Sequence, residues 1–153
     1  MLEHRISDWD DAYSNGANIA RGDRWPAAWV KPAETFRSTL SAAGRAKLDL
    51  AYGARPRNRM DLFLPEGTPK GLAVFVHGGF WLQLDKSFWS HLAAGSVASG
   101  YAVAMPSYTL CPEVRIADIV KEVAAAVAEA ARHVDGPLML AGHSAGGHLA
   151  SRM

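Results

Sequence analysis

The amino-acid sequence predicts an α/β fold in which a mainly parallel sheet carries helices on both faces. Short apolar runs alternate with stretches of helical periodicity over residues 72–150, and such alternation requires crossover connections between parallel strands. The apolar runs are also continuous, as expected for strands that are covered on both faces. We expect a single domain over residues 1–153, with an aromatic-rich segment over residues 1–45 packed on it.

Composition excludes several classes of protein. The 153 residues are 49% apolar and 20% charged, which is typical of an ordinary globular domain. The formal net charge is +1, with acidic and basic residues interspersed, so the chain offers no electrostatic footprint for nucleic acid or an anionic membrane. We therefore expect a small neutral or apolar molecule as the partner.

The sequence carries no sign of export or of a membrane anchor. Residues 1–5 lack an apolar core followed by a cleavage site, which a secretory signal needs. No apolar run approaches the roughly 20 residues that span a bilayer. The lone Cys111 excludes an intrachain disulfide and fits a packing role in a reducing compartment. A cytoplasmic protein is therefore expected.

The first half of the chain predicts an irregular start followed by a hairpin. Residues 1 to about 36 contain tryptophans among Asp, Asn and Gly without sustained periodicity, which indicates short helical turns and loops. These tryptophans could line a cleft, although aromatic anchoring of a weak segment is the favoured interpretation. Alternation over residues 47–52 and 59–64 then predicts two paired strands.

The second half predicts three buried strands and the helices between them. The strands are expected over residues 72–76, 101–105 and 138–141, where apolar residues are continuous. A helix over residues 88–99 should end before Gly100, a residue suited to the left-handed position after a helix. Clear helical spacing begins at Ile116, and that helix should end at the Asp-Gly-Pro run that precedes the last strand.

A Gly-x-Ser-x-Gly run directly after the last strand predicts a nucleophilic serine. Gly142 and Gly146 flank Ser144, because side chains at those positions would collide in a tight strand-to-helix turn that lifts the hydroxyl clear of the sheet. Ala145 then begins a helix, where its backbone N–H can face developing negative charge.

A second glycine motif supplies the other half of this chemistry. His77, Gly78 and Gly79 follow the strand over residues 72–76, so backbone N–H groups of Gly78, Gly79 or Phe80 could approach a bound carbonyl oxygen. His77 is expected to brace this loop by hydrogen bonding. Either motif alone is modest evidence, but both fall at the end of a predicted strand, where the chemistry requires them.

The base and the carboxylate that a serine nucleophile needs are harder to find. In this arrangement they follow the serine along the chain, yet only residues 145–153 follow Ser144. We expect His143 to point away from the site and His148 to pack beneath the turn. Three aspartates are expected to be surface, cap or turn residues: Asp85, Asp118 and Asp135.

Four segments resemble the α/β-hydrolase superfamily, and specifically the branch of hormone-sensitive-lipase-like esterases and kynurenine formamidases. The resemblance runs from about Leu48 to the end of the chain. The matching segments are residues 61–65, 77–81, 108–113 and 142–149. More loosely, residues 9–15 resemble the entry segment of formamidase-like members. The form His-Gly-Gly-x-Trp at residues 77–81 is similar to the formamidase side of this branch.

This resemblance implies the α/β-hydrolase fold, cut after the nucleophile turn. It implies an enzyme that cleaves small esters or aryl-formamides through an acyl-serine intermediate. Ser144 would be the nucleophile, with Gly78, Gly79 and Ala145 as oxyanion donors. No metal and no organic cofactor is implied.

Phe80 and Trp81 adjoin these donors in the sequence, and we expect both to bind the substrate.

The aspartate and histidine of the family have no counterpart in this chain. We therefore expect an N-terminal portion of a longer hydrolase that turns over poorly by itself. Two alternatives stay open: a kynurenine formamidase specifically, and a noncatalytic binding protein or inactive fragment that retains the fold. In the family's sheet order, the strand over residues 138–141 would also expose an apolar edge, which invites self-association.

Overall fold

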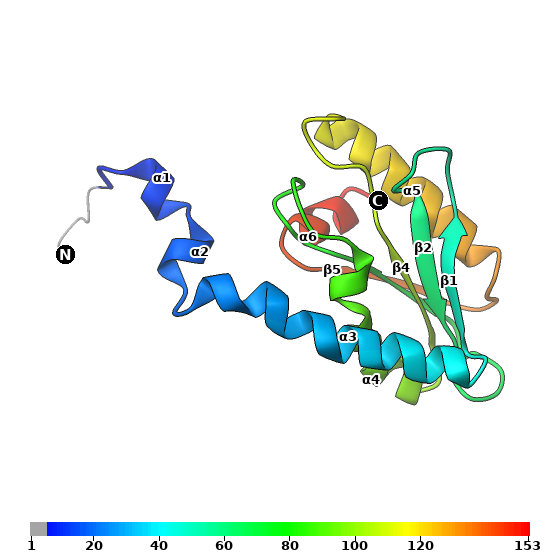
Figure 1. The fold of residues 1–153 in the computed structure, drawn as a ribbon. Coiled ribbons are helices and arrows are strands. Elements are labelled where there is room, and N and C mark those ends of the chain that lie inside the picture. The colour runs from blue at the N-terminus through cyan, green and yellow to red at the C-terminus, as the bar shows by residue number, and fades with distance from the viewer. Residues whose placement is uncertain (1–5) are drawn as a thin grey trace, which may run out of the picture.

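Five strands form one mixed sheet in the order β1-β2-β4-β3-β5 (Figure 1). The computed structural model describes residues 6–153, so residues 1–5, on which the expectation about a secretory signal rests, lie outside the described part. The strands are β1 (Ala46–Ala51), β2 (Arg59–Phe63), β3 (Leu72–Val76), β4 (Ala102–Pro106) and β5 (Leu138–Gly142).

The predicted α/β class is confirmed, with two different halves in the sheet. β1, β2 and β4 pair antiparallel, whereas β4, β3 and β5 pair parallel. In the parallel half, Val76 at the end of β3 lies opposite Gly142 at the end of β5. This register brings the two glycine motifs, which follow those strand ends, to the same edge of the sheet.

Helices cover both faces of the sheet. α5 (Ile116–Ala131) and α6 (Ala145–Ala150) lie on one face, while α3 (Trp25–Ala42) and α4 (Ala94–Ala98) lie on the other (Figure 1). Strand β4 contributes to both cores, because Ala104 packs with the α5 side and Val103 with the α3 side. This alternation explains the continuous apolar run of that strand.

Helix α5 follows the predicted periodicity. Its buried residues are Ile119, Val123, Ala126 and Ala130. Spacings of three and four residues place them on one stripe, which packs on the sheet.

The N-terminal segment differs from its prediction, because α3 is one helix of 18 residues where short turns and loops were predicted. Pro26 lies in the first turn, where a missing N–H costs nothing. The core-facing residues Trp29, Ala33, Phe36 and Leu40 recur at helical spacing, and this packing outweighs the irregular local composition. α1 (Trp9–Ala12) and α2 (Asn15–Asn18) have no buried residues and extend away from the sheet (Figure 1).

The helix predicted over residues 88–99 is also different. Two 3-10 turns, η2 (Lys86–Phe88) and η3 (Ser90–Ala93), precede the short helix α4. The end of this region follows the prediction, since Gly100 has φ +92°.

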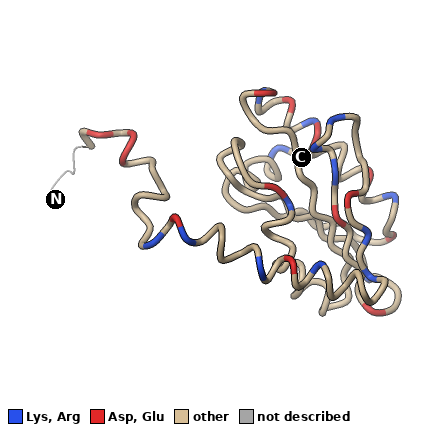
Figure 2. The backbone as a smooth tube through the Cα atoms, viewed as in Figure 1, with Lys and Arg blue, Asp and Glu red and all other residues tan. Residues whose placement is uncertain are grey.

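Charged residues of both signs are interspersed along the chain (Figure 2). Within residues 6–153, no helix is both long enough and apolar enough to cross a membrane.

Candidate active site

Ser144 lies on a strained turn between β5 and α6. Its backbone has φ 52° and ψ −119°, a combination that a residue with a side chain rarely adopts outside functional turns. Two hydrogen bonds hold the turn: the His143 N–H donates to the Val76 carbonyl at 3.1 Å, and the Gly146 N–H donates to the His143 carbonyl at 2.8 Å. The turn is therefore anchored directly to the end of β3.

The flanking glycines are required by backbone contacts. A Cβ added to Gly142 would lie 2.2 Å from the Gly146 carbonyl oxygen, and one added to Gly146 would lie 2.0 Å from the Val76 carbonyl oxygen. No side chain can occupy such space without moving the main chain. The geometry thus explains why a Gly-x-Ser-x-Gly run occupies this position.

The loop after β3 packs against the serine turn. A Cβ added to Gly78 would lie 2.8 Å from the His143 carbonyl oxygen and 3.2 Å from the Ser144 Cβ. Gly79 has φ +124° and its carbonyl accepts hydrogen bonds from the Leu82 and Gln83 N–H groups.

Three backbone N–H groups are the expected oxyanion donors. Within residues 6–153, the N–H groups of Gly78, Gly79 and Ala145 donate no hydrogen bond. Free N–H groups beside a nucleophile are the elements of an oxyanion-binding site.

His77 braces the loop, as the sequence suggested. Its ring is buried, stacks on Tyr108 with a centroid separation of 4.3 Å, and lies 2.7 Å through Nδ1 from the Gly78 carbonyl oxygen. Burial lowers the pKa of His77 to about 4, so the ring is neutral at pH 7 and Nδ1–H donates to Gly78. The Tyr108 hydroxyl donates to the His77 carbonyl at 2.9 Å.

A cavity of about 290 Å³ opens in front of Ser144. Three segments distant in sequence line it, namely residues 15–29, 79–89 and 143–144. Aromatic side chains dominate its wall: Trp25, Trp29, Phe80 and Trp89. The sequence favours an anchoring role for the N-terminal tryptophans, whereas Trp25 and Trp29 line the cavity. The helical spacing from Trp29 onward is the sequence signal for this placement.

Phe80 and Trp81 lie in different environments. Phe80 is 45% exposed and lines the cavity. Trp81 packs against the core on the α5 side, with its ring edge-to-face with His148 at 5.4 Å, and is not among the described residues that line the cavity. Both have positive φ values, +53° and +58°, so the strained backbone turns two neighbouring side chains to different sites.

The two remaining histidines differ from their predictions, whereas two of the aspartates match theirs. His143 was expected to point away, but it lines the cavity and its ring lies 5.2 Å from that of Trp89. His148 is exposed and contacts Trp81. Asp85 caps the turn η2, and Asp118 pairs with Lys121 at 3.1 Å.

Among the described residues, the cavity lacks carboxylates and any cluster of metal-binding side chains. No carboxylate lines it within the described residues. Residues 6–153 also contain no cluster of three His, Cys, Asp or Glu side chains that could hold a metal ion.

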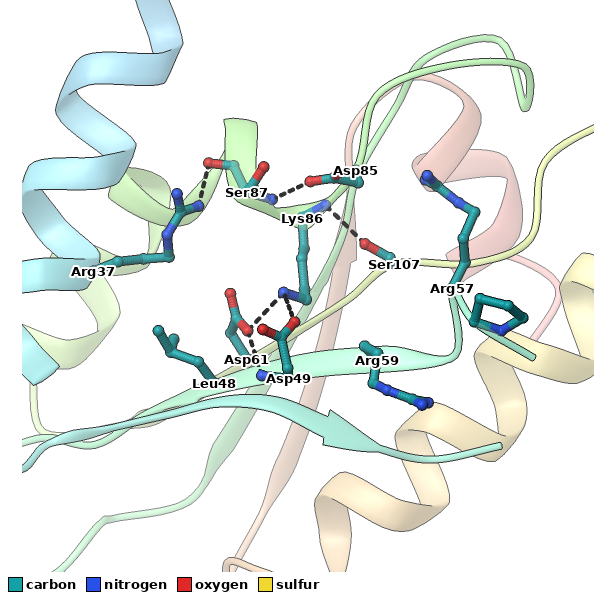
Figure 3. Close-up of a pocket in the computed structure, with 11 residues that line it drawn as sticks. Arg37, Leu48, Asp49, Arg57, Arg59, Asp61, Asp85, Lys86, Ser87 and Ser107 are labelled. Atoms are coloured by element: carbon teal, nitrogen blue, oxygen red, sulfur yellow. Dashed lines mark hydrogen bonds and ion pairs between the residues drawn. The ribbon is translucent and has the colours of Figure 1, made fainter. Parts of the chain in front are cut away.

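A second cavity, of about 370 Å³, is lined by the next part of the same loop (Figure 3). There Lys86 lies between two carboxylates, with its Nζ 2.7 Å from Asp49 and 2.8 Å from Asp61. Arg57 donates to the Tyr108 carbonyl at 2.7 Å and to the Leu84 carbonyl at 2.5 Å. These contacts hold the loop at a cavity that Ser144 does not line.

The chain is similar in sequence to curated hydrolases. The chain is 31% identical to kynurenine formamidase from Drosophila melanogaster over all of this chain and 55% of that protein. It is 30% identical to isoprenylcysteine alpha-carbonyl methylesterase from Arabidopsis thaliana, over 70% of this chain and 27% of that one. The chain thus spans about half of the first relative and about a quarter of the second.

Solved structures agree with the fold. A protein from Silicibacter sp. TM1040, described as a candidate thioesterase, is 58% identical with a TM-score of 0.90, covering 94% of this chain and 54% of that one. Esterase B from Lactobacillus rhamnosis is 23% identical with a TM-score of 0.61, over 84% of this chain and 47% of that one, and supports the fold alone.

The family profile named BD-FAE matches residues 60–153, a range that contains both glycine motifs, the whole of β3, β4 and β5, and all of β2 except its first residue. Together with the identity to kynurenine formamidase over the whole chain, this match shows that the chain belongs to the BD-FAE family of the α/β-hydrolase superfamily, in the branch of hormone-sensitive-lipase-like esterases and kynurenine formamidases.

Proposed function

We propose that this chain carries the nucleophile and oxyanion site of a serine hydrolase that cleaves small esters or aryl-formamides. The observation that carries the proposal is the contact between Gly78 and the Ser144 turn, beside N–H groups that donate to no other group in residues 6–153. A hydroxyl on a strained turn, next to free donors, is the arrangement that acyl transfer needs.

In the proposed mechanism, the Ser144 oxygen attacks the substrate carbonyl and passes its proton to a base. The N–H groups of Ala145, Gly78 and Gly79 bind the oxyanion of the tetrahedral intermediate. The intermediate expels an alcohol or amine, which takes the proton back from the base and leaves an acyl group on Ser144. Water then attacks the acyl group by the same route and frees the serine.

The base and its orienting carboxylate are assigned in this proposal to residues outside the chain, since no carboxylate among the described residues lines the cavity. Triad members act as a unit, and their loss costs several orders of magnitude in rate. We therefore expect the 153-residue chain by itself to turn over poorly or not at all.

The test is hydrolysis of 4-nitrophenyl acetate, combined with labelling by a fluorophosphonate. The full-length polypeptide that contains this chain should hydrolyse the ester and take up the label on Ser144. Ser144→Ala should abolish both signals, while Ser151→Ala, at the C-terminal cap of the following helix α6, should leave both unchanged. An unlabelled, inactive full-length protein would favour a noncatalytic binding protein.

The narrower candidate is a kynurenine formamidase, which the alignment with the Drosophila protein over the whole chain favours. The values of kcat/KM on N-formylkynurenine and on short aryl esters should separate the two activities. A preference of tenfold or more for the formamide would support the formamidase, and the opposite preference would support an aryl esterase.

We also propose that β5 mediates self-association of the 153-residue chain. Within residues 6–153, β5 pairs only with β3, and Leu138 and Met139 are exposed on this edge strand. An unpaired apolar edge is a template for another strand. Sedimentation velocity should detect oligomers that Leu138→Lys reduces, and a monomer at high concentration would contradict the proposal.

A further inference from the structure

Two aromatic side chains at the cavity in front of Ser144 have no aromatic partner. Trp25, in the first turn of α3, is 51% exposed, and Phe80, in the loop after β3, is 45% exposed. Both line the cavity, and neither ring packs against another aromatic ring within residues 6–153. Exposed rings at one cavity are typical of a binding surface.

Other aromatic rings of the molecule are used differently. Trp9 is 58% exposed but stacks on Tyr13 at 5.9 Å, away from the cavity. Trp29 and Trp89 pack against each other at 4.6 Å and belong to the core on the α3 side. The cavity therefore has a packed aromatic wall, Trp29 and Trp89, and two further rings that nothing in the described chain covers.

The described side chains that line the cavity include no Lys, Arg, Asp or Glu. Its longer polar side chains are those of Asn15, Gln83 and His143. A carboxylate or an ammonium group that entered would lose water and gain no opposite charge, which is unfavourable. An aromatic ring would instead gain apolar contact and ring packing.

We propose that this cavity is a binding site for an uncharged aromatic ring, and that Trp25 and Phe80 are the side chains that select it. The ring would be part of the acyl or leaving group of the hydrolase substrate, so its role in catalysis rests on the proposed function. The ring-binding property itself does not. Ring substituents that are charged at pH 7 are disfavoured at this cavity.

The test measures binding without hydrolysis, using the full-length polypeptide that contains this chain, with Ser144→Ala. Two aryl ketones serve as probes because they have no bond to cleave: acetophenone, which is neutral, and 4-acetylbenzoate, which carries a carboxylate. Titrations followed by ligand-observed NMR give the Kd of each probe. We expect acetophenone to bind at least tenfold more tightly than 4-acetylbenzoate.

Each proposed residue has a matched control. Trp9→Ala is the control for Trp25→Ala, since both tryptophans are similarly exposed and near the N-terminus. Leu82→Ala is the control for Phe80→Ala, since Leu82 is 58% exposed in the same loop and does not line the cavity. We expect the cavity variants to weaken acetophenone binding roughly three- to tenfold and the controls to leave it unchanged.

Trp25→Leu and Phe80→Leu keep apolar bulk and remove the ring, and they should also weaken binding, which separates ring contact from disrupted folding. Equal affinity for the two ketones, or equal effects of cavity and control variants, would overturn the proposal. Ring binding without any hydrolysis by the full-length protein would refute the proposed function alone. Hydrolysis through Ser144 without ring selectivity would refute this inference alone.

Discussion

The segment over residues 79–89 lines two cavities that differ in kind. The cavity at Ser144 is uncharged and aromatic, with exposed rings that have no aromatic partner within residues 6–153. In the other, Lys86 is paired with Asp49 and Asp61 (Figure 3). There Arg57 also donates to two main-chain carbonyls. The two cavities therefore differ in role. The charged contacts of one cavity, which we call the charged side, fix the loop. The aromatic rings of the other cavity, the aromatic side, remain available to a ligand.

The strongest test of this division is Lys86→Met, which removes the charge between two carboxylates. Asp61 is only 1% exposed, so it would be left as a buried charge without a cation beside it, accepting only the Asp49 N–H. Breaking such a pair from one side costs about 3–5 kcal/mol, and urea unfolding should register this loss. Lys121→Met, which breaks the exposed pair with Asp118, should cost far less, because water screens that pair. Equal losses would show that the charged side does not fix the loop.

The second test uses pH, because an uncharged, buried His77 bonds the Gly78 carbonyl in the loop beside Ser144. Its pKa is about 4 when folded, against 6.5 when exposed, so the unfolded chain binds the proton more tightly. The stability from neutral His77 is complete above pH 6.5 and is lost as pH falls toward 4. Linkage gives a loss of about 2 kcal/mol between pH 7 and pH 5.

Denaturant unfolding at these two pH values measures the loss, with His77→Asn as the comparison. The variant lacks this titration and should show a pH dependence smaller by about 2 kcal/mol. An unchanged pH dependence would mean that burial of the neutral ring contributes nothing.

The smallest expected effect comes from Arg57→Lys, which connects the two sides. Arg57 binds the carbonyl of Leu84, a residue of the aromatic cavity, and that of Tyr108, whose hydroxyl in turn binds His77. Lysine keeps the charge but cannot reach both carbonyls in the same planar geometry, so we expect a loss of about 1 kcal/mol.

A connection through Arg57 also predicts a weaker binding of acetophenone, by about twofold, in the same variant. Arg59→Lys serves as the control, since Arg59 donates to the carbonyls of Gly53 and Asn58 instead. If ring binding is unchanged while stability falls, the two cavities are independent.

The two glycine motifs could be predicted from sequence because their constraints are local. The space around Gly142 and Gly146 is closed by main-chain atoms within a few residues or on the adjacent strand, so the residue types themselves record the turn. The three buried strands and helix α5 were predictable for a related reason, since periodicity reports which faces are covered.

The composition of the cavity could not be predicted in this way. Trp25 and Phe80 are far apart in sequence, and only the packing of α3 on the sheet brings both to the cavity at Ser144. The orientation of Trp81 depends on backbone strain at two successive residues, for which the sequence carries no visible signal.

The sequence by itself determined the class of fold, the serine turn and the neighbouring loop, because each follows from local sterics or from a repeating pattern of apolar residues. Only the tertiary structure decided which rings surround the serine, that His143 lines its cavity, and that a buried lysine in the loop pairs with a carboxylate of β2. These contacts join segments that are distant along the chain, and their energies depend on burial, which exists only once the chain has folded.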